Sequence, residues 1–374
     1  MRFCKVIAVF LCAIFVFCGT IDANAQIGTS AKASVLIEAA SGQVICAKNE
    51  HQKLPMASTT KIMTALLTLE QGKDRLDEQF VVDSDAIMVE GTSMGLQKGD
   101  TVSLRALCVG MLLASGNDAS NAAAVRIGGN IENFVKLMNE RAKQIGIQNT
   151  SFETPSGLDG ENHYSSAYDM ALLAREAIKN DDFLAICSAS TLKTEFGNPI
   201  STRYFTNHNK LLKSYDGAIG VKTGFTKKAG RCLVSAATRN GVTLIAVTLG
   251  APNDWQDHKN LLDYGFSKCE KVAFDTDFLD VNIGVVGAEQ KTIPFEVSTA
   301  PQAVVLSGQK ENITRKIYAS AINYAPIYKG QKIGSVCYFN GENLICEVDL
   351  IASQDIFKTE YRPTLWDRIK SIFT

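Results

Sequence analysis

Two apolar, β-branched runs joined by a tight turn constrain the fold of this chain most. Residues 231–237 and 242–249 are connected through Asn240-Gly241, a dipeptide typical of two-residue β-hairpin turns because both residues tolerate positive φ. Two more strand patterns, at 34–37 and 43–46, flank the turn sequence Ala39-Ala40-Ser41-Gly42 near the N-terminus. We therefore expect one sheet that the first and last segments of a large domain close together.

Helical patterns fill the sequence between these strands, and a different pattern follows them. Apolar residues recur at helical spacing in four stretches, at 62–69, 104–112, 134–142 and 170–178. After Phe274 the chain changes to short alternating strands with turn residues between them. The expected fold class is α+β: an antiparallel sheet with a helical cluster over 26–272, followed by a small all-β domain over 273–358.

Both ends of the chain carry patterns of their own. Arg2 and Lys5 precede an uncharged run, and Ala23-Asn24-Ala25 supplies a small-x-small cleavage site, so 1–25 is predicted to be a signal peptide rather than a membrane anchor. Near the other end, Pro363 precedes an apolar stripe with basic neighbours, formed by Leu365, Trp366, Ile369, Ile372 and Phe373. We interpret 359–374 as an amphipathic helix that anchors the exported chain to a membrane surface. The alternative is a helix packed on the β domain.

Composition and residue spacing exclude several classes of function. The formal net charge is −1 and no zinc-finger, Walker or dinucleotide-binding pattern occurs, so nucleic acid is not an expected partner. The four histidines lack ligand spacing, and we expect neither a metal nor a cofactor.

Cys337 and Cys346 flank a hairpin signal, and a two-residue turn at Gly341-Glu342 would set them opposite each other. Whether they form a disulfide stays open.

The stretch Ser58-Thr59-Thr60-Lys61 is an S-x-x-K pattern. On a helix, residues at i and i+3 share a face, so the lysine amine can reach the serine hydroxyl. The spacing alone is weak, because Ser190–Lys193 and Ser307–Lys310 repeat it. Ser58 differs in directly preceding a strongly apolar helix, where backbone N–H groups favour developing negative charge. The alternative is that Ser58 has no catalytic role and only caps the N-terminus of this helix.

Two later motifs strengthen the first. Ser115-Gly116-Asn117 follows the second helical stretch, and Lys222-Thr223-Gly224 follows an apolar run. Lys61 can act as a base only if neutral, and partial burial with a second ammonium from Lys222 would lower its pKa. Ser115 can relay a proton to a leaving amine and Asn117 can bind a substrate peptide. Lys222 with Thr223 suits a terminal carboxylate, and Gly224 lets substrate backbone lie against its strand.

These motifs together resemble those of the low-molecular-weight penicillin-binding D-Ala-D-Ala carboxypeptidases, a serine peptidase family of the S11 type. The resemblance covers about 33–266 and is carried by residues 55–65, 114–119 and 220–226, with further likeness at 154–159 and 167–171. It implies a β-lactamase/transpeptidase-like domain, and the β domain and amphipathic tail repeat the family's arrangement. Met56 and Phe225 depart from the pattern; Phe225 stands where one branch has a histidine.

By that resemblance, Ser58 is the nucleophile and Lys61 its base, with Ser115 as the third catalytic group. Asn117, Lys222, Thr223 and Gly224 bind substrate, and the backbone N–H groups of Ser58 and Phe225 form the oxyanion hole. The implied substrates are peptidoglycan stem peptides ending in D-Ala-D-Ala, with β-lactam antibiotics as inhibitors. The implied location is the cell envelope, at the outer face of the cytoplasmic membrane.

Three alternatives use the same nucleophile. A β-lactamase is disfavoured because nothing between Asn149 and Thr191 resembles a Glu-x-x-Leu-Asn deacylating loop, and because those enzymes lack the β domain and tail. An endopeptidase that cuts cross-links is disfavoured by the carboxylate-binding pair Lys222-Thr223. A penicillin-binding sensor without turnover would be acylated at Ser58 but release no D-Ala.

Overall fold

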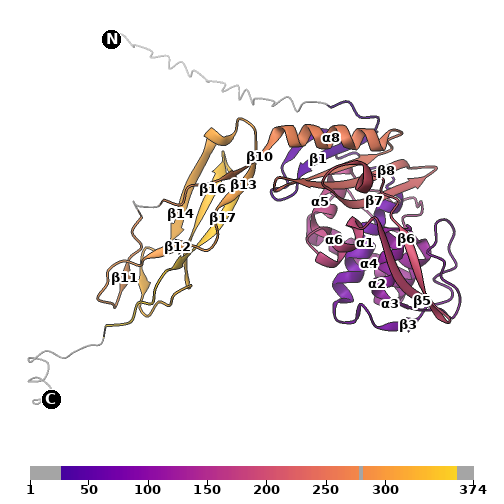
Figure 1. The fold of residues 1–374 in the computed structure, drawn as a ribbon, viewed down its shortest axis with the longest axis horizontal. Coiled ribbons are helices and arrows are strands. Elements are labelled where there is room, and N and C mark those ends of the chain that lie inside the picture. Colours follow the sequence, from indigo (N-terminus) through magenta and orange to yellow (C-terminus); the bar gives the residue numbers. More distant parts are fainter. Residues whose placement is uncertain (1–26, 278–280, 360–374) are drawn as a thin grey trace, which may run out of the picture.

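The structure is a computed structural model that describes residues 27–277 and 281–359 of the 374-residue chain. It has a large mixed part and an elongated β-rich part, which follow each other in the chain and extend to opposite sides in Figure 1. The predicted signal peptide lies outside the described residues, as does all of the predicted anchor except Thr359.

The large part is built on five antiparallel strands in the order β2-β1-β9-β8-β7. Their bounds are β1 Ala33–Glu38, β2 Val44–Lys48, β7 Ala218–Thr226, β8 Gly230–Arg239 and β9 Val242–Leu249. Strand β1 pairs with β9, so the first and last segments do close one sheet, as the sequence indicated. At the β8–β9 turn, Asn240 and Gly241 have φ of 51° and 75°, the positive values that a type I′ turn requires.

Helices cover both faces of this sheet, which is why its strands are apolar on both sides. Along β1, Val35 and Ile37 belong to the core shared with the helical cluster, whereas Leu36 packs with Leu261 and Leu262 of α8 (Asp254–Lys268). The alternation is the period of two that a strand imposes. Figure 1 shows α8 on the outer side of the sheet and the helical cluster on the other side.

The helical cluster lies between β2 and β7 in the sequence. It consists of α1 Lys61–Gln71, α2 Leu104–Leu112, α3 Asn117–Gly128, α4 Ile131–Ile145, α5 Ala167–Ala177, α6 Asp181–Ser188 and the short α7 Leu211–Ser214. A second sheet, in the order β3-β4-β5-β6, borders this cluster; its strands are β3 Gln79–Val81, β4 Thr101–Ser103, β5 Thr191–Gly197 and β6 Ile200–Thr206. The four stretches with helical periodicity correspond to α1, α2, α4 and α5.

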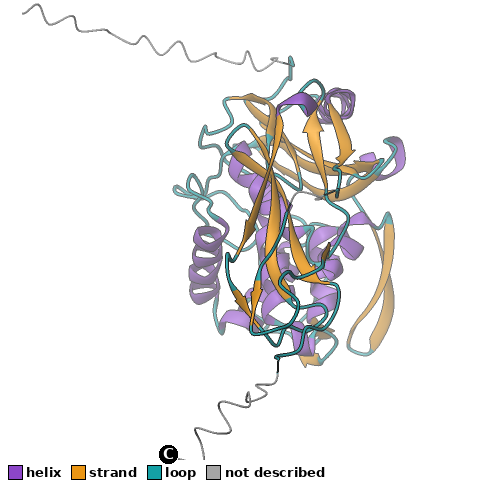
Figure 2. Ribbon diagram, turned by 90° about the vertical axis from the view of Figure 1, so that its left-hand side faces the viewer, coloured by secondary structure: helices purple, strands orange, loops and turns teal. Residues whose placement is uncertain are grey.

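The β-rich part begins at β10 (Cys269–Ala273), which follows α8 directly and pairs with β13 (Gln302–Leu306). A four-stranded sheet has the order β12-β17-β16-β14, and β11 pairs in parallel with β15. The bounds are β11 Val285–Val286, β12 Phe295–Val297, β14 Ile313–Ala319, β15 Asn323–Tyr324, β16 Lys332–Asn340 and β17 Asn343–Ala352. In the view from this side (Figure 2), its long strands run from the end near α8 to the end where the described chain stops.

The expectation that Cys337 and Cys346 lie opposite each other is wrong, as the register of β16 and β17 shows. The turn pairs Asn340 with Asn343, but a bulge after Tyr338 shifts the ladder, so that Cys346 lies opposite Tyr338 and Cys337 opposite Glu347. Because successive residues of a strand point to opposite faces, the bulge places the two thiols on different faces of the sheet. Both cysteines are free thiols.

Candidate active site

Ser58 lies in a short 3₁₀ turn, Ala57–Thr60, that leads directly into α1. The turn is braced by its own side chains: Thr59 Oγ1 donates to the carbonyl of Met56 at 2.5 Å, and Thr60 Oγ1 to that of Ala57 at 2.8 Å. Ala57 has a φ of 51°, a strained value for a residue with a Cβ. Such strain persists only where the surroundings hold it, and it is concentrated at functional sites.

Lys61, the first residue of α1, has no exposed surface. Its Nζ lies 3.0 Å from Ser58 Oγ, 2.7 Å from Asn117 Oδ1 and 2.6 Å from the carbonyl oxygen of Ser156. A charged ammonium donates to all three. A neutral amine has two N–H groups and one lone pair, so it can donate to the two fixed carbonyl-type oxygens and accept the Ser58 proton.

The electrostatic surroundings favour the neutral amine. Burial lowers the pKa of Lys61 well below its usual 10.5, and the nearby Lys222 ammonium lowers it further, while Asp118 acts in the opposite direction. Lys222 is itself 1 % exposed, and its burial lowers its pKa from 10.5 to about 7. The direction predicted for Lys61 from the sequence, and both of its causes, agree with the structure.

The turn that carries Ser58 and the start of α1 form the first wall of the site. The connection between α2 and α3 forms the second wall. Ser115 has a φ of 62°, and its carbonyl accepts a hydrogen bond from Thr92 Oγ1 at 2.5 Å. Asn117 begins α3, and besides Lys61 it contacts the carbonyl of Glu90 through Nδ2 at 2.7 Å. The Asn117 oxygen is therefore engaged by Lys61, which leaves the amide nitrogen as the group available to a substrate.

The third wall is strand β7. Thr223, Gly224 and Phe225 line the site, whereas Lys222 is buried behind it and donates from Nζ to the carbonyl of Thr223 at 2.9 Å. A Cβ on Gly224 would lie 3.1 Å from the backbone nitrogens of Ser58 and Thr59. The glycine here thus has a structural reason that the sequence did not suggest: it allows the 3₁₀ turn to approach β7 closely.

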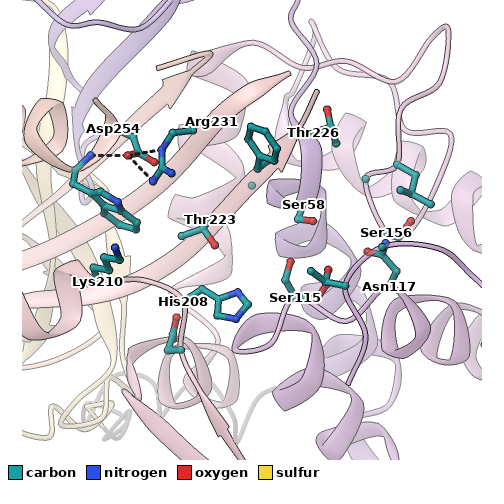
Figure 3. Close-up of a pocket in the computed structure, with 18 residues that line it drawn as sticks. Ser58, Ser115, Asn117, Ser156, His208, Lys210, Thr223, Thr226, Arg231 and Asp254 are labelled. Atoms are coloured by element: carbon teal, nitrogen blue, oxygen red, sulfur yellow. Dashed lines mark hydrogen bonds and ion pairs between the residues drawn. The ribbon is translucent and has the colours of Figure 1, made fainter. Parts of the chain in front are cut away.

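These three walls enclose a pocket of about 620 Å³. Figure 3 shows Ser58, Ser115 and Asn117 on one side and Thr223 across from them, with Lys210, Arg231 and Asp254 farther along the same wall. Of the site residues predicted from the sequence, the pocket lining contains Ser58, Ser115, Asn117, Thr223, Gly224 and Phe225. It assigned no role to the lining residue Ser156, although 154–159 was part of the resemblance, and it missed the lining residues His208, Lys210, Arg231, Asp254 and Trp255, which have no motif of their own.

Gly157 allows the Ser156 loop to lie close to the 3₁₀ turn that carries Ser58. Its φ is +84°, and a Cβ would lie 2.1 Å from the carbonyl oxygen of Ala57. We expect Gly157→Ala to lower kcat/KM by about 10²-fold, because displacements near 1 Å in a catalytic geometry have that effect. Gly146 offers a matched control, since its φ is +87° and no atom lies within 4 Å of the position that a Cβ would take there.

Both variants introduce a similar backbone strain of about 1–3 kcal/mol, measurable by urea unfolding. Only Gly157→Ala should also slow the two reactions that the family resemblance implies, D-Ala release and acylation by penicillin. Equal activity of the two variants would show that the close contact with Ala57 is not needed for catalysis.

Within residues 27–277 and 281–359, no group of three or more His, Cys, Asp or Glu side chains is arranged to hold a metal ion. In the same ranges, no helix has the length and apolar character needed to cross a membrane.

Comparison with known proteins identifies the class to which this fold and pocket belong. Residues 20–253 match the family of D-alanyl-D-alanine carboxypeptidases, and residues 272–358 match the C-terminal domain of penicillin-binding protein 5. The carboxypeptidase DacF of Bacillus subtilis is 33 % identical, covering 90 % of this chain and 89 % of the relative. DacC of Escherichia coli is 32 % identical, covering 96 % and 94 %.

Solved structures agree with these matches. Penicillin-binding protein 5 of Haemophilus influenzae is 30 % identical with a TM-score of 0.69, covering 89 % of this chain and 99 % of that one. The chain therefore belongs to the D-alanyl-D-alanine carboxypeptidase family, the low-molecular-weight penicillin-binding proteins of the S11 type. It is a serine hydrolase, and its relatives support D-Ala-D-Ala carboxypeptidase activity and a place in the bacterial cell envelope.

Proposed function

We propose that this enzyme removes the terminal D-Ala from peptidoglycan stem peptides through an acyl-enzyme on Ser58. The observation that carries the proposal is the buried Lys61 amine, which lies 3.0 Å from Ser58 Oγ and whose pKa is lowered well below 10.5. A serine hydroxyl is a weak nucleophile, and an adjacent neutral base is what activates it. No cofactor is needed for this chemistry.

In the first half-reaction, Lys61 takes the proton of Ser58 as Oγ attacks the carbonyl carbon of the penultimate D-Ala. The backbone N–H groups of Ser58 and Phe225 stabilise the oxyanion. The proton then passes through the Ser115 hydroxyl to the nitrogen of the terminal D-Ala, and the C–N bond breaks. Asn117 Nδ2 and the Thr223 hydroxyl hold the substrate peptide and its carboxylate.

In the second half-reaction, a water attacks the ester carbonyl and gives its proton to Lys61. The ester bond breaks, Ser58 regains its proton and the shortened peptide leaves. A β-lactam enters the same first step and acylates Ser58. Because its ring-opened leaving amine stays attached, the departing group cannot diffuse out of the pocket, and the acyl-enzyme persists.

The test uses residues 26–374, purified and incubated with diacetyl-Lys-D-Ala-D-Ala, with free D-Ala measured by mass spectrometry. A second sample receives penicillin, and the labelled residue is located by peptide mapping. We expect release of D-Ala and a penicilloyl group on Ser58. Labelling without release would instead support a sensor, whereas rapid loss of the penicilloyl group would support a β-lactamase. Cleavage of cross-linked dimers in preference to pentapeptides would support an endopeptidase.

We also propose that the exported enzyme is held at the outer face of the cytoplasmic membrane by residues 359–374. Large side chains are exposed at the end of the β-rich part where the described chain stops: Val286, Tyr324 and Phe357 are 51, 73 and 69 % exposed. Val286 pairs with Tyr324, and Thr359 N donates to the carbonyl of Gly287. Apolar and aromatic groups of this kind suit a membrane interface, and Figure 1 places this end far from α1.

Truncation after Tyr361 tests this attachment. We expect the chain 26–374 to float with vesicles containing phosphatidylglycerol and the chain 26–361 to stay in solution, because the basic, Trp-containing stripe is removed. D-Ala release from the soluble peptide should be the same for both chains. Equal flotation would contradict a tail anchor.

A further inference from the structure

Two segments that are far apart in the sequence must keep a fixed distance for the Lys61 amine to stay in place. One is the 3₁₀ turn that carries Ser58. The other is the loop of Ser156, whose carbonyl accepts a hydrogen bond from Lys61 at 2.6 Å and which lies beside Asn117 in Figure 3. Ser156 belongs to no helix or strand, so side chains must join its loop to the turn and to α1. Thr64 is one of them, because its Oγ1 donates to the carbonyl of Pro155 at 2.6 Å.

His163 supplies a second join between the same two segments. It is 3 % exposed. Its Nδ1 accepts a hydrogen bond from the backbone N–H of Glu153 at 3.0 Å, and its Nε2 lies 2.8 Å from Thr60 Oγ1. Glu153 begins the segment that leads to Ser156, and Thr60 directly precedes Lys61. One imidazole ring therefore contacts both the loop and the turn.

The partners of His163 determine which ring nitrogen carries the proton. A backbone N–H can only donate, so Nδ1 must be the unprotonated, accepting nitrogen. The neutral ring then carries its proton on Nε2 and donates it to Thr60 Oγ1. The Thr60 hydroxyl in turn donates to the carbonyl of Ala57 at 2.8 Å. Three hydrogen bonds thus run in one direction from Glu153 to Ala57, an arrangement in which each bond polarises the next.

The surroundings keep this ring neutral. Burial lowers the pKa of His163 from 6.5 to about 4, with Glu153 and Asp159 acting in the opposite direction and Lys228 and Lys61 lowering it further. A second proton would have to sit on Nδ1, where it would face the Glu153 N–H instead of accepting from it. The neutral form is therefore the one that keeps all three hydrogen bonds.

The chain of hydrogen bonds ends at a strained residue of the turn. Ala57 has a φ of 51°, and its carbonyl oxygen is the atom that a Cβ on Gly157 would approach to 2.1 Å. The hydrogen bond from Thr60 thus fixes the carbonyl against which the loop packs. Because strain of this kind persists only where neighbouring groups hold it, the bonds that start at His163 help to set the position of Ser58.

We propose that His163 is a positioning residue, which joins the loop of Ser156 to the turn of Ser58 and so sets the distance between the Lys61 amine and the serine hydroxyl. This inference rests on the proposed function and adds to it a residue that touches neither the substrate nor the reacting atoms. His163 does not line the pocket, and no sequence motif singled it out.

The experiment compares the wild type of residues 26–374 with His163→Leu and His163→Gln. Leucine removes both hydrogen bonds, whereas glutamine offers a neutral N–H donor and an oxygen acceptor. The rate of penicillin acylation, and kcat and KM for D-Ala release, are measured per active site titrated with fluorescent penicillin. We expect His163→Leu to lower kcat and the acylation rate by roughly 10- to 100-fold, the effect of a displacement near 1 Å, and His163→Gln to recover most of this loss. KM should change little, because Lys61 serves both half-reactions and both slow together.

His258→Leu is the matched control. His258 is also fully buried, and its ring lies between the hydroxyls of Ser235 and Thr248 at 2.5 and 2.9 Å, but it belongs to α8, on the other side of the sheet from α1. Both leucine variants should unfold at lower urea concentration, and only His163→Leu should lose kcat per titrated site. An unchanged kcat in His163→Leu, or an equal loss in His258→Leu, would overturn the proposal.

Thr60→Val provides a second measurement that does not alter the ring. It removes the hydroxyl that links His163 to Ala57 and keeps the branched shape of the side chain. The variant should slow acylation by a factor similar to that of His163→Leu, and the double variant should be little slower than either single one, because both changes break one chain. Full activity of Thr60→Val, or losses that multiply, would contradict the proposal. If the wild type releases no D-Ala, the proposed function fails, whereas the acylation rates still test His163.

Discussion

Ser58→Ala is expected to abolish both D-Ala release and covalent labelling by penicillin. The loss in kcat should be about 10⁴- to 10⁶-fold, the range seen when the nucleophile of a serine hydrolase is removed. The variant should fold, because among the described residues the Ser58 hydroxyl has one hydrogen bond, which it accepts from Lys61, while the turn is braced by Thr59 and Thr60. Released D-Ala and intact mass after penicillin treatment measure the two losses.

Ser190 and Ser307 provide matched controls, because each begins the same S-x-x-K spacing. Lys193 lies in strand β5, where residues three apart point to opposite faces. Ser307 lies in a turn, and its backbone N–H donates to the carbonyl of Lys268. Ser190→Ala and Ser307→Ala should therefore keep full activity. A penicilloyl group on either serine, or activity that survives in Ser58→Ala, would refute the assignment of the nucleophile.

Local sequence signals predicted those parts of the fold that depend on neighbouring residues. The Asn240-Gly241 turn is one example, because its dihedral preference is intrinsic to the dipeptide. Helices α1, α2, α4 and α5 were found through large apolar residues at helical spacing. Helix α3 was missed because its sequence, NDASNAAAVRIG, is rich in small residues, which pack closely in the cluster without giving an apolar periodicity.

Interactions between distant segments account for what the sequence did not predict. The carbonyl of Ser156 accepts a hydrogen bond from Lys61 although 95 residues separate them, and a backbone carbonyl has no sequence signature. Arg231 reaches the pocket only through the register of β7 and β8. The bulge that separates Cys337 from Cys346 is likewise a property of strand pairing, and the turn sequence alone could not reveal it.

The difference between local sequence signals and contacts between distant segments also applies to the two lysines of the site, Lys61 and Lys222. Lys61 lies one turn from Ser58, so a local helix was enough to predict their contact once the later motifs had singled out this S-x-x-K pattern, and its lowered pKa was predicted from burial and from Lys222. Lys222 was expected to face a ligand because Lys-Thr-Gly is a recognisable motif. Its side chain is buried and lowers the pKa of Lys61, and its part in substrate binding stays a prediction.

Lys61→Met is expected to slow both penicillin acylation and D-Ala release by about 10³-fold or more, since a positioned general base contributes roughly 10²- to 10⁴-fold and Lys61 serves in both half-reactions. Lys61→Arg should be comparably inactive, because arginine keeps a positive charge and its donors but cannot lose its proton. Lys193→Met, which alters the exposed lysine of another S-x-x-K pattern, should behave as the wild type.

The pH dependence of the wild type separates a base from a purely electrostatic role. A base must be neutral, so the rate should rise with pH as Lys61 loses its proton and level off well below pH 10.5, because burial and Lys222 lower its pKa. If Lys61 acted as a cation instead, the rate would fall over the same range and Lys61→Arg would retain activity. Acylation rates measured from pH 5 to pH 10 for the wild type and Lys61→Arg therefore decide between the two roles, and a rate that falls with increasing pH would contradict the mechanism proposed for Ser58.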